Sequence, residues 1–122
     1  MANDFKRFTV PSVNTSVGAS ASAVYTVPAG AGSTALESIV IGITLANKTS
    51  SGVTASVFLD NFSGSNDVYI VKDATIPAGS SLEVMSGNKI VLQNNGTTGD
   101  VLRVSSSTAT AIDTTISVLE DV

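Results

Sequence analysis

Hydrophobic and polar residues alternate along three long stretches of the chain, residues 38–45, 53–60 and 112–119. Because successive side chains of a β-strand point to opposite faces, this period of two predicts strands with one apolar face each. Val, Ile and Thr are frequent in all three stretches, and their branched Cβ atoms favour strands over helices. In the first stretch the predicted apolar face consists of Ile39, Ile41, Ile43 and Leu45, and the opposite face consists of Ser38, Val40, Gly42 and Thr44.

Clusters of Gly, Pro, Asn and Ser separate these runs and predict turns between them. We expect strands at residues 5–10, 22–27, 35–46, 53–60, 68–73, 81–86, 89–93, 101–106 and 112–119. Short strands at this spacing predict an all-β domain, a two-sheet antiparallel β-sandwich with about eight or nine strands. Its apolar faces close over one core. The pattern is compatible with both an immunoglobulin-like and a jelly-roll topology.

The first part of the chain differs from the rest in composition. Residues 12–23 are almost all small, and they connect residues 5–10 to the following strands. We therefore divide the chain into residues 1–21, an N-terminal arm or edge strand with a linker, and residues 22–122, the sandwich domain. The first ten residues either dock on a partner as an arm or pair as an ordinary edge strand.

Charged residues are few. The 122 residues are 43% hydrophobic and 13% charged, with a net charge of −4, whereas an average soluble domain is about 25% charged. The surface must therefore be rich in Ser, Thr, Asn and Gly, and such a surface is easily buried against a partner because few charges need desolvating. The six Lys and Arg residues are scattered, so we expect no nucleic-acid partner.

The residue types present exclude several kinds of chemistry. The chain has no His and no Cys, which excludes Ser-His-Asp and Cys-His nucleophile systems and the usual zinc sites. The acidic residues show no spacing that favours a catalytic pair. We therefore expect no enzyme activity and no cofactor. The first eight residues lack the apolar run of a signal peptide, and no stretch approaches the length of a membrane span, so we expect a soluble protein made in a cytoplasm.

One loop and one strand pair suggest polar contacts. Residues 60–67 are rich in oxygen ligands of the kind that calcium prefers, but Phe62 breaks the EF-hand spacing, and we therefore favour a polar hairpin tip over a calcium site. If the last two strands form a hairpin, Arg103 faces Asp113 as a surface ion pair.

Five apolar residues are candidates for an interface. Val40, Phe58 and Tyr69 fall on the polar phase of their strands, and either line a subunit contact or form a second core face under a loop. Phe5 and Phe8 belong to the N-terminal arm. Tyr25, Phe62 and Tyr69 are aromatic residues that could stack on a sugar ring.

Several stretches of strand and turn residues resemble a known group of proteins. They are Val24–Gly30, Leu45–Asn47, Ile70–Glu83, Lys89–Leu92, Gly99–Val104 and Ile116–Glu120. Together they resemble small virion structural proteins of tailed bacteriophages, particularly of marine and cyanobacterial phages. The resemblance implies a β-sandwich that assembles, often as a symmetric oligomer, onto a head, neck, tail or fibre, with no catalytic residues to carry over. The loop at residues 96–99 is longer than the tight turn expected there.

These observations predict a non-enzymatic phage virion protein, either a head decoration protein or a neck or tail accessory component. Its partners would be itself, in a symmetric homo-oligomer such as a trimer, and other virion proteins. Nucleic acid and membrane are not expected as partners. The alternative is an adhesion or carbohydrate-binding module of a phage fibre or cell surface.

Overall fold

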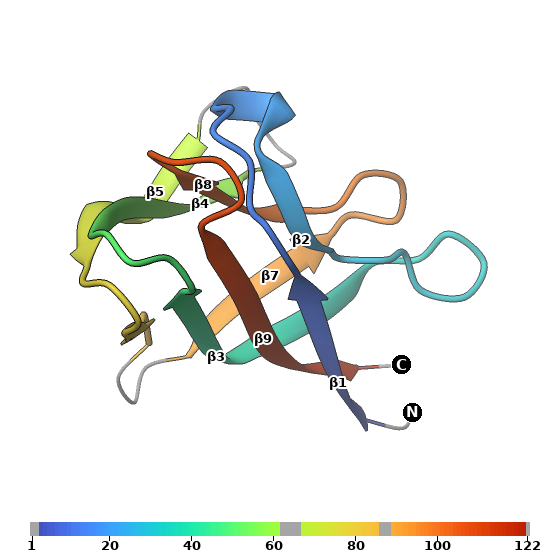
Figure 1. The fold of residues 1–122 in the computed structure, drawn as a ribbon. Helices are drawn as coiled ribbons and strands as arrows, with labels where there is room; N and C mark the ends of the chain where they lie inside the picture. Colours follow the sequence, from blue (N-terminus) through green and yellow to red (C-terminus); the bar gives the residue numbers. More distant parts are fainter. Residues whose placement is uncertain (1–2, 62–66, 86–88, 122) are drawn as a thin grey trace.

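Two antiparallel β-sheets packed face to face form the protein (Figure 1). The computed structural model describes residues 3–61, 67–85 and 89–121. In sheet A the strand order is β1-β9-β3-β6, and β7 also pairs with β3; in sheet B the order is β2-β8-β4-β5. The predicted fold class, a two-sheet antiparallel β-sandwich, is confirmed.

All nine predicted strands are present, with ends that differ from the prediction by three residues at most. Sheet A contains β1 (Asn3–Val10), β9 (Ile112–Asp121), β3 (Leu36–Asn47), β6 (Ser81–Glu83) and β7 (Ile90–Asn94). Sheet B contains β2 (Ser22–Thr26), β8 (Val101–Ser106), β4 (Val53–Asp60) and β5 (Asp67–Ile76). A short 3-10 turn, η1 (Gly18–Ser20), precedes β2.

The core lies between the sheets and consists of the side chains that point inward from both of them. Burial of each large aliphatic side chain stabilises the fold by about 1.5–3 kcal/mol before entropy is counted. The fully buried members include Ile43, Leu45, Leu92, Ile112 and Ile116 of sheet A, and Val57, Leu102 and Val104 of sheet B.

A β-bulge in β3 corrects the face predicted for residues 38–41. Val40 pairs with Val118 of β9 and Gly42 pairs with the preceding residue, Ser117, so Ile41 is an extra residue without a partner on β9. One extra residue moves all side chains on one side of it to the opposite face. Val40 is therefore in the core with 0% exposure, and its prediction as an outward residue is wrong. Ile41 is 39% exposed instead.

The last two strands do not form a hairpin, because β8 belongs to sheet B and β9 to sheet A. The predicted pair of Arg103 with Asp113 is therefore wrong. Arg103 Nε lies 3.0 Å from Asp60 Oδ2 on the adjacent strand β4, and Lys48 Nζ lies 2.9 Å from Asp113 Oδ1.

The N-terminal residues are part of the sandwich. Residues 3–10 form the edge strand β1, which pairs with β9 along its whole length. After β1 the chain crosses to sheet B (Figure 1). Val13 is fully buried in the core, and its N–H donates to the carbonyl of Ile112 at 2.8 Å. The Arg103 guanidinium donates to the carbonyl of Ala21 at 2.9 Å and fixes the end of this segment to β8.

Candidate functional site

The outer face of sheet A has a row of apolar side chains across four strands. In the strand register Phe5 of β1 lies opposite Leu119 of β9, Leu119 lies opposite Ile39 of β3, and Ile39 lies opposite Val91 of β7. Phe5 is 76% exposed and Val91 is 55% exposed, while Leu119 and Ile39 are half-buried. Ile41, in the bulge, adds a fifth apolar side chain beside them. We call Phe5, Leu119, Ile39 and Val91 the apolar row.

On one side of the apolar row the surface is acidic. Glu37 of β3, which is exposed, pairs with the exposed Gln93 of β7 at the next outward position. We call these two residues the Glu37 flank.

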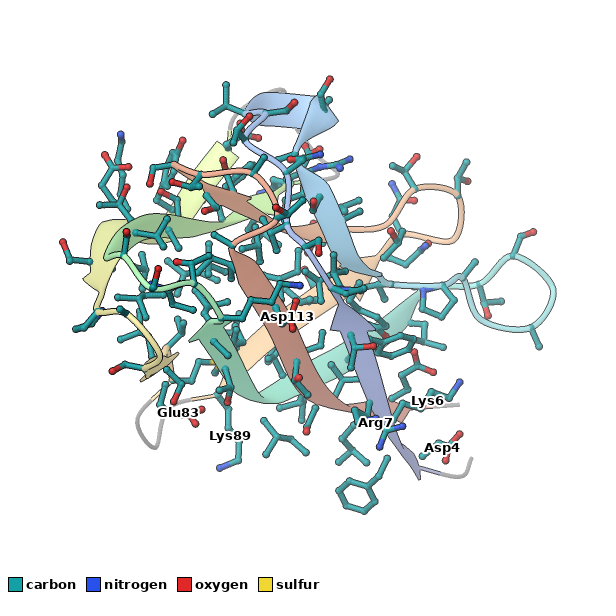
Figure 2. The ribbon with its side chains drawn as sticks, viewed as in Figure 1. Asp4, Lys6, Arg7, Glu83, Lys89 and Asp113 are labelled. Carbon is teal, nitrogen blue, oxygen red and sulfur yellow. The ribbon has the colours of Figure 1, made fainter. Side chains whose placement is uncertain are left out.

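On its other side the apolar row is bordered by an exposed arginine. Arg7 of β1 pairs with Ser117 of β9, which pairs with Gly42 of β3. We call these three residues the Arg7 flank. At the far edge, the Glu83 carboxylate of β6 accepts a hydrogen bond from Thr44 Oγ1 at 3.1 Å. Figure 2 shows Arg7 and Glu83 at opposite edges of the sheet.

Among the described residues, the outer face of sheet B has no comparable exposed row. Phe58 of β4 is on the outward phase, as predicted, but its exposure is 0%. Of its two predicted roles, the exposed contact is therefore wrong, and a second core face is what the structure shows. Tyr69 of β5 and Arg103 of β8 lie opposite it on its two sides. The Tyr69 ring packs on the Phe58 ring with centroids 5.2 Å apart. Cross-strand neighbours therefore bury Phe58 and form a small second core outside the sheet.

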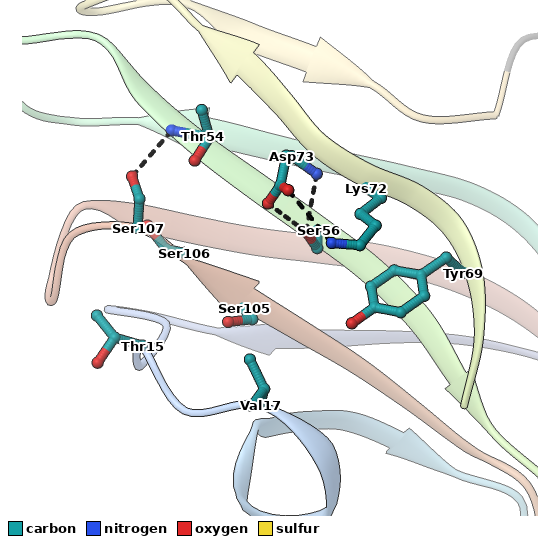
Figure 3. A pocket seen from close by; sticks show the side chains of 10 residues that line it. All are labelled: Thr15, Val17, Thr54, Ser56, Tyr69, Lys72, Asp73, Ser105, Ser106 and Ser107. Carbon is teal, nitrogen blue, oxygen red and sulfur yellow. Dashed lines mark hydrogen bonds and ion pairs between the residues drawn. The ribbon is translucent and has the colours of Figure 1, made fainter. Parts of the chain in front are cut away.

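A cleft of about 210 Å³ lies on the same outer face, between sheet B and the N-terminal segment (Figure 3). Hydroxyl groups line most of it, together with one aromatic ring and one ion pair. Its lining residues are Thr15, Val17, Thr54, Ser56, Tyr69, Lys72, Asp73, Ser105, Ser106 and Ser107.

The charged groups of the cleft lie at one end. Lys72 Nζ is 3.3 Å from Asp73 Oδ2 and 5.3 Å from the centroid of the Tyr69 ring. Asp73 has a positive φ of 52°, which is unusual for a residue other than glycine. Its N–H donates to Ser56 Oγ at 2.9 Å. The cleft can offer hydrogen bonds to a polar ligand and an aromatic face at 41% exposure.

A buried polar contact joins the two sheets at the inward side of β1. The Tyr25 hydroxyl of β2 donates to the Glu120 carboxylate of β9 and lies 2.7 Å from Ser38 Oγ of β3. Lys6 Nζ lies 2.9 Å from Glu120 Oε1. Glu120 is 1% exposed, and these partners compensate the cost of burying its charge.

The same contact shifts two pKa values. Burial, followed by the hydrogen bond to Glu120, raises the pKa of Tyr25 well above its usual range. The hydrogen bond to Glu120 and the attraction of its charge raise the pKa of Lys6. None of these groups lines the cleft. We therefore assign Tyr25, Glu120 and Lys6 a structural role, and the 4% exposure of Tyr25 rules out the predicted stacking of its ring on a sugar.

The five candidate interface residues do not share one surface. Phe5 is exposed on sheet A, and Tyr69 is exposed on sheet B. Phe8 is half-buried, with its ring 4.7 Å from that of Tyr25. Val40 and Phe58 are fully buried.

The pattern analysis missed three members of the apolar row, namely Leu119, Ile39 and Val91. Strict alternation placed Ile39 in the core. The glycine inside the strand, Gly42, was the signal that a bulge interrupts the alternation there.

Two candidate ligand sites include residues outside the described part of the chain. Phe62, a candidate for sugar stacking, and most of the proposed calcium loop lie outside the described residues. Among the residues that are described, no three acidic side chains gather as a metal site would require. Within the same residues, no helix has the length and apolar character needed to cross a membrane.

Comparisons with known proteins gave no match: no family model, no curated protein and no solved structure is significantly similar to this chain.

Proposed function

We propose that this chain is a non-enzymatic structural protein of a tailed-phage particle, a head decoration or neck or tail accessory component that binds other particle proteins. The outer face of sheet A is the contact surface. The apolar row carries this proposal. Its four side chains lie in register across the full width of the sheet, and the two at its ends, Phe5 and Val91, are more than half exposed. Exposed apolar patches of this kind are typical of protein interaction sites.

The composition of the surface supports the proposal. With only 13% charged residues, the face can be dehydrated at small electrostatic cost. The strand and turn motifs resemble those of small virion proteins, and this resemblance is the reason for proposing that the contact is made on a phage particle.

Co-sedimentation with particles of the virus that encodes the chain tests the proposal, and two valines provide a matched pair. Val91 belongs to the apolar row and is 55% exposed, whereas Val68 is 51% exposed on β5 of sheet B. Val91→Asp places a charge in the proposed contact and should abolish co-sedimentation. Val68→Asp should leave it unchanged. Unfolding midpoints of both variants in urea verify that each is folded.

Two results would overturn this proposal: failure of the wild-type chain to sediment with the particles, or loss of binding by Val68→Asp while Val91→Asp still binds. Deleting residues 2–10 is a less specific test, because it removes the edge strand β1 from sheet A as well as Phe5.

A carbohydrate-binding module is the second candidate function, favoured by the hydroxyl-lined cleft on sheet B. The exposed ring of Tyr69 beside Lys72 and Asp73 offers a stacking surface next to hydrogen-bonding groups. This function predicts saturable binding to a panel of oligosaccharides by the wild-type chain and its loss in Tyr69→Ala. Binding that is unchanged in Tyr69→Ala would remove the cleft as the glycan site.

A further inference from the structure

The apolar and charged side chains on the outer face of sheet A are arranged so that this face is complementary to a second copy of itself. The apolar row lies in the middle, with the acidic Glu37 flank on one side and the Arg7 flank on the other. Lys89 is exposed and directly precedes β7, whose first residue Ile90 pairs with Val40. Continuing that ladder by one residue places Lys89 level with Ile41, beside the Arg7 flank. Glu37 thus borders one side of the row and the two cations border the other, where the exposed Glu83 carboxylate of β6 lies beyond them, next to Gly42.

From this arrangement we propose that a second copy of this chain covers the apolar row, with the outer face of sheet A packed against the same face of the copy. The two-fold axis runs along the apolar row. The inference rests on the proposed contact surface and concerns the free chain, in which a second copy covers this surface until the particle contact replaces it. Each residue of the row then meets its own counterpart, and the Glu37 flank of one copy lies over the Arg7 flank and Lys89 of the other.

A second two-fold arrangement would also place the apolar row of one copy on the apolar row of the other. The charges favour the axis along the row over this arrangement. An axis parallel to the strands, between β9 and β3, places the two Glu37 residues only about one strand spacing, roughly 4.8 Å, apart in the plane of the interface. Like charges at that distance oppose association. An axis along the row separates them by about four residues along the strands, roughly 13 Å. It also places Glu37 near Lys89 of the partner copy.

The size of the face indicates how tightly the copies bind. Four strands at about 4.8 Å spacing and eight residues at about 3.4 Å rise present roughly 500 Å² per copy. That area is at the low end of specific interfaces. The dimer is therefore weak and forms in a concentration-dependent manner.

Single-cysteine cross-linking tests the geometry, since the chain has no cysteine of its own. Phe5→Cys and Val91→Cys place the new thiol at the two ends of the row, and Val68→Cys is the matched control on sheet B. With the axis along the row, Phe5→Cys and Val91→Cys each form a disulfide with their own counterpart under mild oxidation. With the axis parallel to the strands, disulfides form only when the two variants are mixed.

Sedimentation velocity over a wide concentration series accompanies the cross-linking. The wild-type mass should rise toward that of a dimer, and Val91→Asp should weaken the association by roughly tenfold or more, as expected for a charge placed in a desolvated contact. A wild-type chain that stays monomeric overturns the inference. So does cross-linking of Val68→Cys as efficient as that of Val91→Cys, or cross-linking found only in the mixture.

The two proposals can fail separately. Wild-type chain that binds particles but remains a monomer, with no self-cross-linking, overturns self-association and leaves the contact surface in place. Dimerisation through the row without any particle binding supports this inference and overturns the proposed function.

Discussion

The outer faces of the two sheets differ, although both are built from alternating strands rich in Val, Ile and Thr. On sheet A the bulge at Ile41 turns Ile39 and Ile41 outward, and the apolar row remains exposed at both ends. On sheet B the outward Phe58 is buried between its neighbours Tyr69 and Arg103, and the N-terminal segment runs along the face and forms a cleft. The comparison shows that alternation determines which residues point outward, while neighbouring strands and crossing segments determine which of them stay exposed.

The largest expected difference in protein stability is between substitutions of the two phenylalanines on these faces. Phe58→Ala removes a fully buried ring and should lower the free energy of unfolding by about 3–5 kcal/mol. Phe5→Ala removes a ring that is 76% exposed and should change it by about 0.5 kcal/mol or less. Urea denaturation of both variants at low protein concentration measures the difference. Equal losses would show that the outer face of sheet B is not a closed layer.

The two tyrosines of sheet B provide the next largest contrast. Tyr25→Phe removes the hydroxyl that donates to the buried Glu120, and should cost about 1–3 kcal/mol because a buried carboxylate loses a donor. Tyr69→Phe, at an exposed position, should cost almost nothing. Denaturation of each variant at neutral pH gives both values, and a loss in Tyr69→Phe as large as that in Tyr25→Phe would contradict the structural role of the buried contact.

The Tyr25 effect should also depend on pH in one direction. The folded state raises the pKa of Tyr25, so its contribution is complete below the usual tyrosine pKa of about 10 and is lost as pH rises above it. The stability difference between wild type and Tyr25→Phe should therefore shrink in alkali. A difference that grows as pH rises would contradict the assigned shift.

Substitutions of two arginines on the outer faces should differ by a smaller amount in their effect on the free energy of unfolding. Arg103→Met on sheet B removes the hydrogen bonds to Asp60 and to the carbonyl of Ala21, and should cost about 1–2 kcal/mol. Hydrogen exchange should become faster in residues 14–21, which this side chain fixes to β8. Arg7→Met on sheet A should change monomer stability by about 0.5 kcal/mol or less. Unchanged exchange in Arg103→Met would show that other contacts hold the segment.

The smallest expected effect concerns the ion pair between Lys48 and Asp113 at the start of β9. The hydrogen bond from Lys48, followed by that from the Ser12 N–H, lowers the pKa of Asp113. A lowered pKa contributes stability above the ordinary aspartate pKa of about 4, and the contribution is lost as pH falls through the folded value. Lys48→Gln should cost about 0.5 kcal/mol at neutral pH. The cost should vanish in acid, and a cost that persists at low pH would contradict this assignment.

The sequence predicted the strands well because alternation, β-branched residues and turn residues act locally. Gly42 was the one local sign of the bulge, and it did not locate the extra residue, because that residue is defined by the partner register on β9. The sequence also did not reveal that β8 and β9 belong to different sheets. The predicted pairing of Arg103 with Asp113 was wrong for that reason. The Tyr25 and Glu120 contact joins residues far apart in the chain, and no local pattern marks it.

Hydroxyl-radical footprinting of the particle-bound chain and of the free chain, diluted until it is monomeric, tests the central claim most directly. If the outer face of sheet A makes the contact, Phe5, Leu119 and Val91 become protected in the bound state, while Tyr69 and Val17 are labelled as in the free chain. Protection of Tyr69 and Val17 with unchanged labelling of the apolar row would contradict the account.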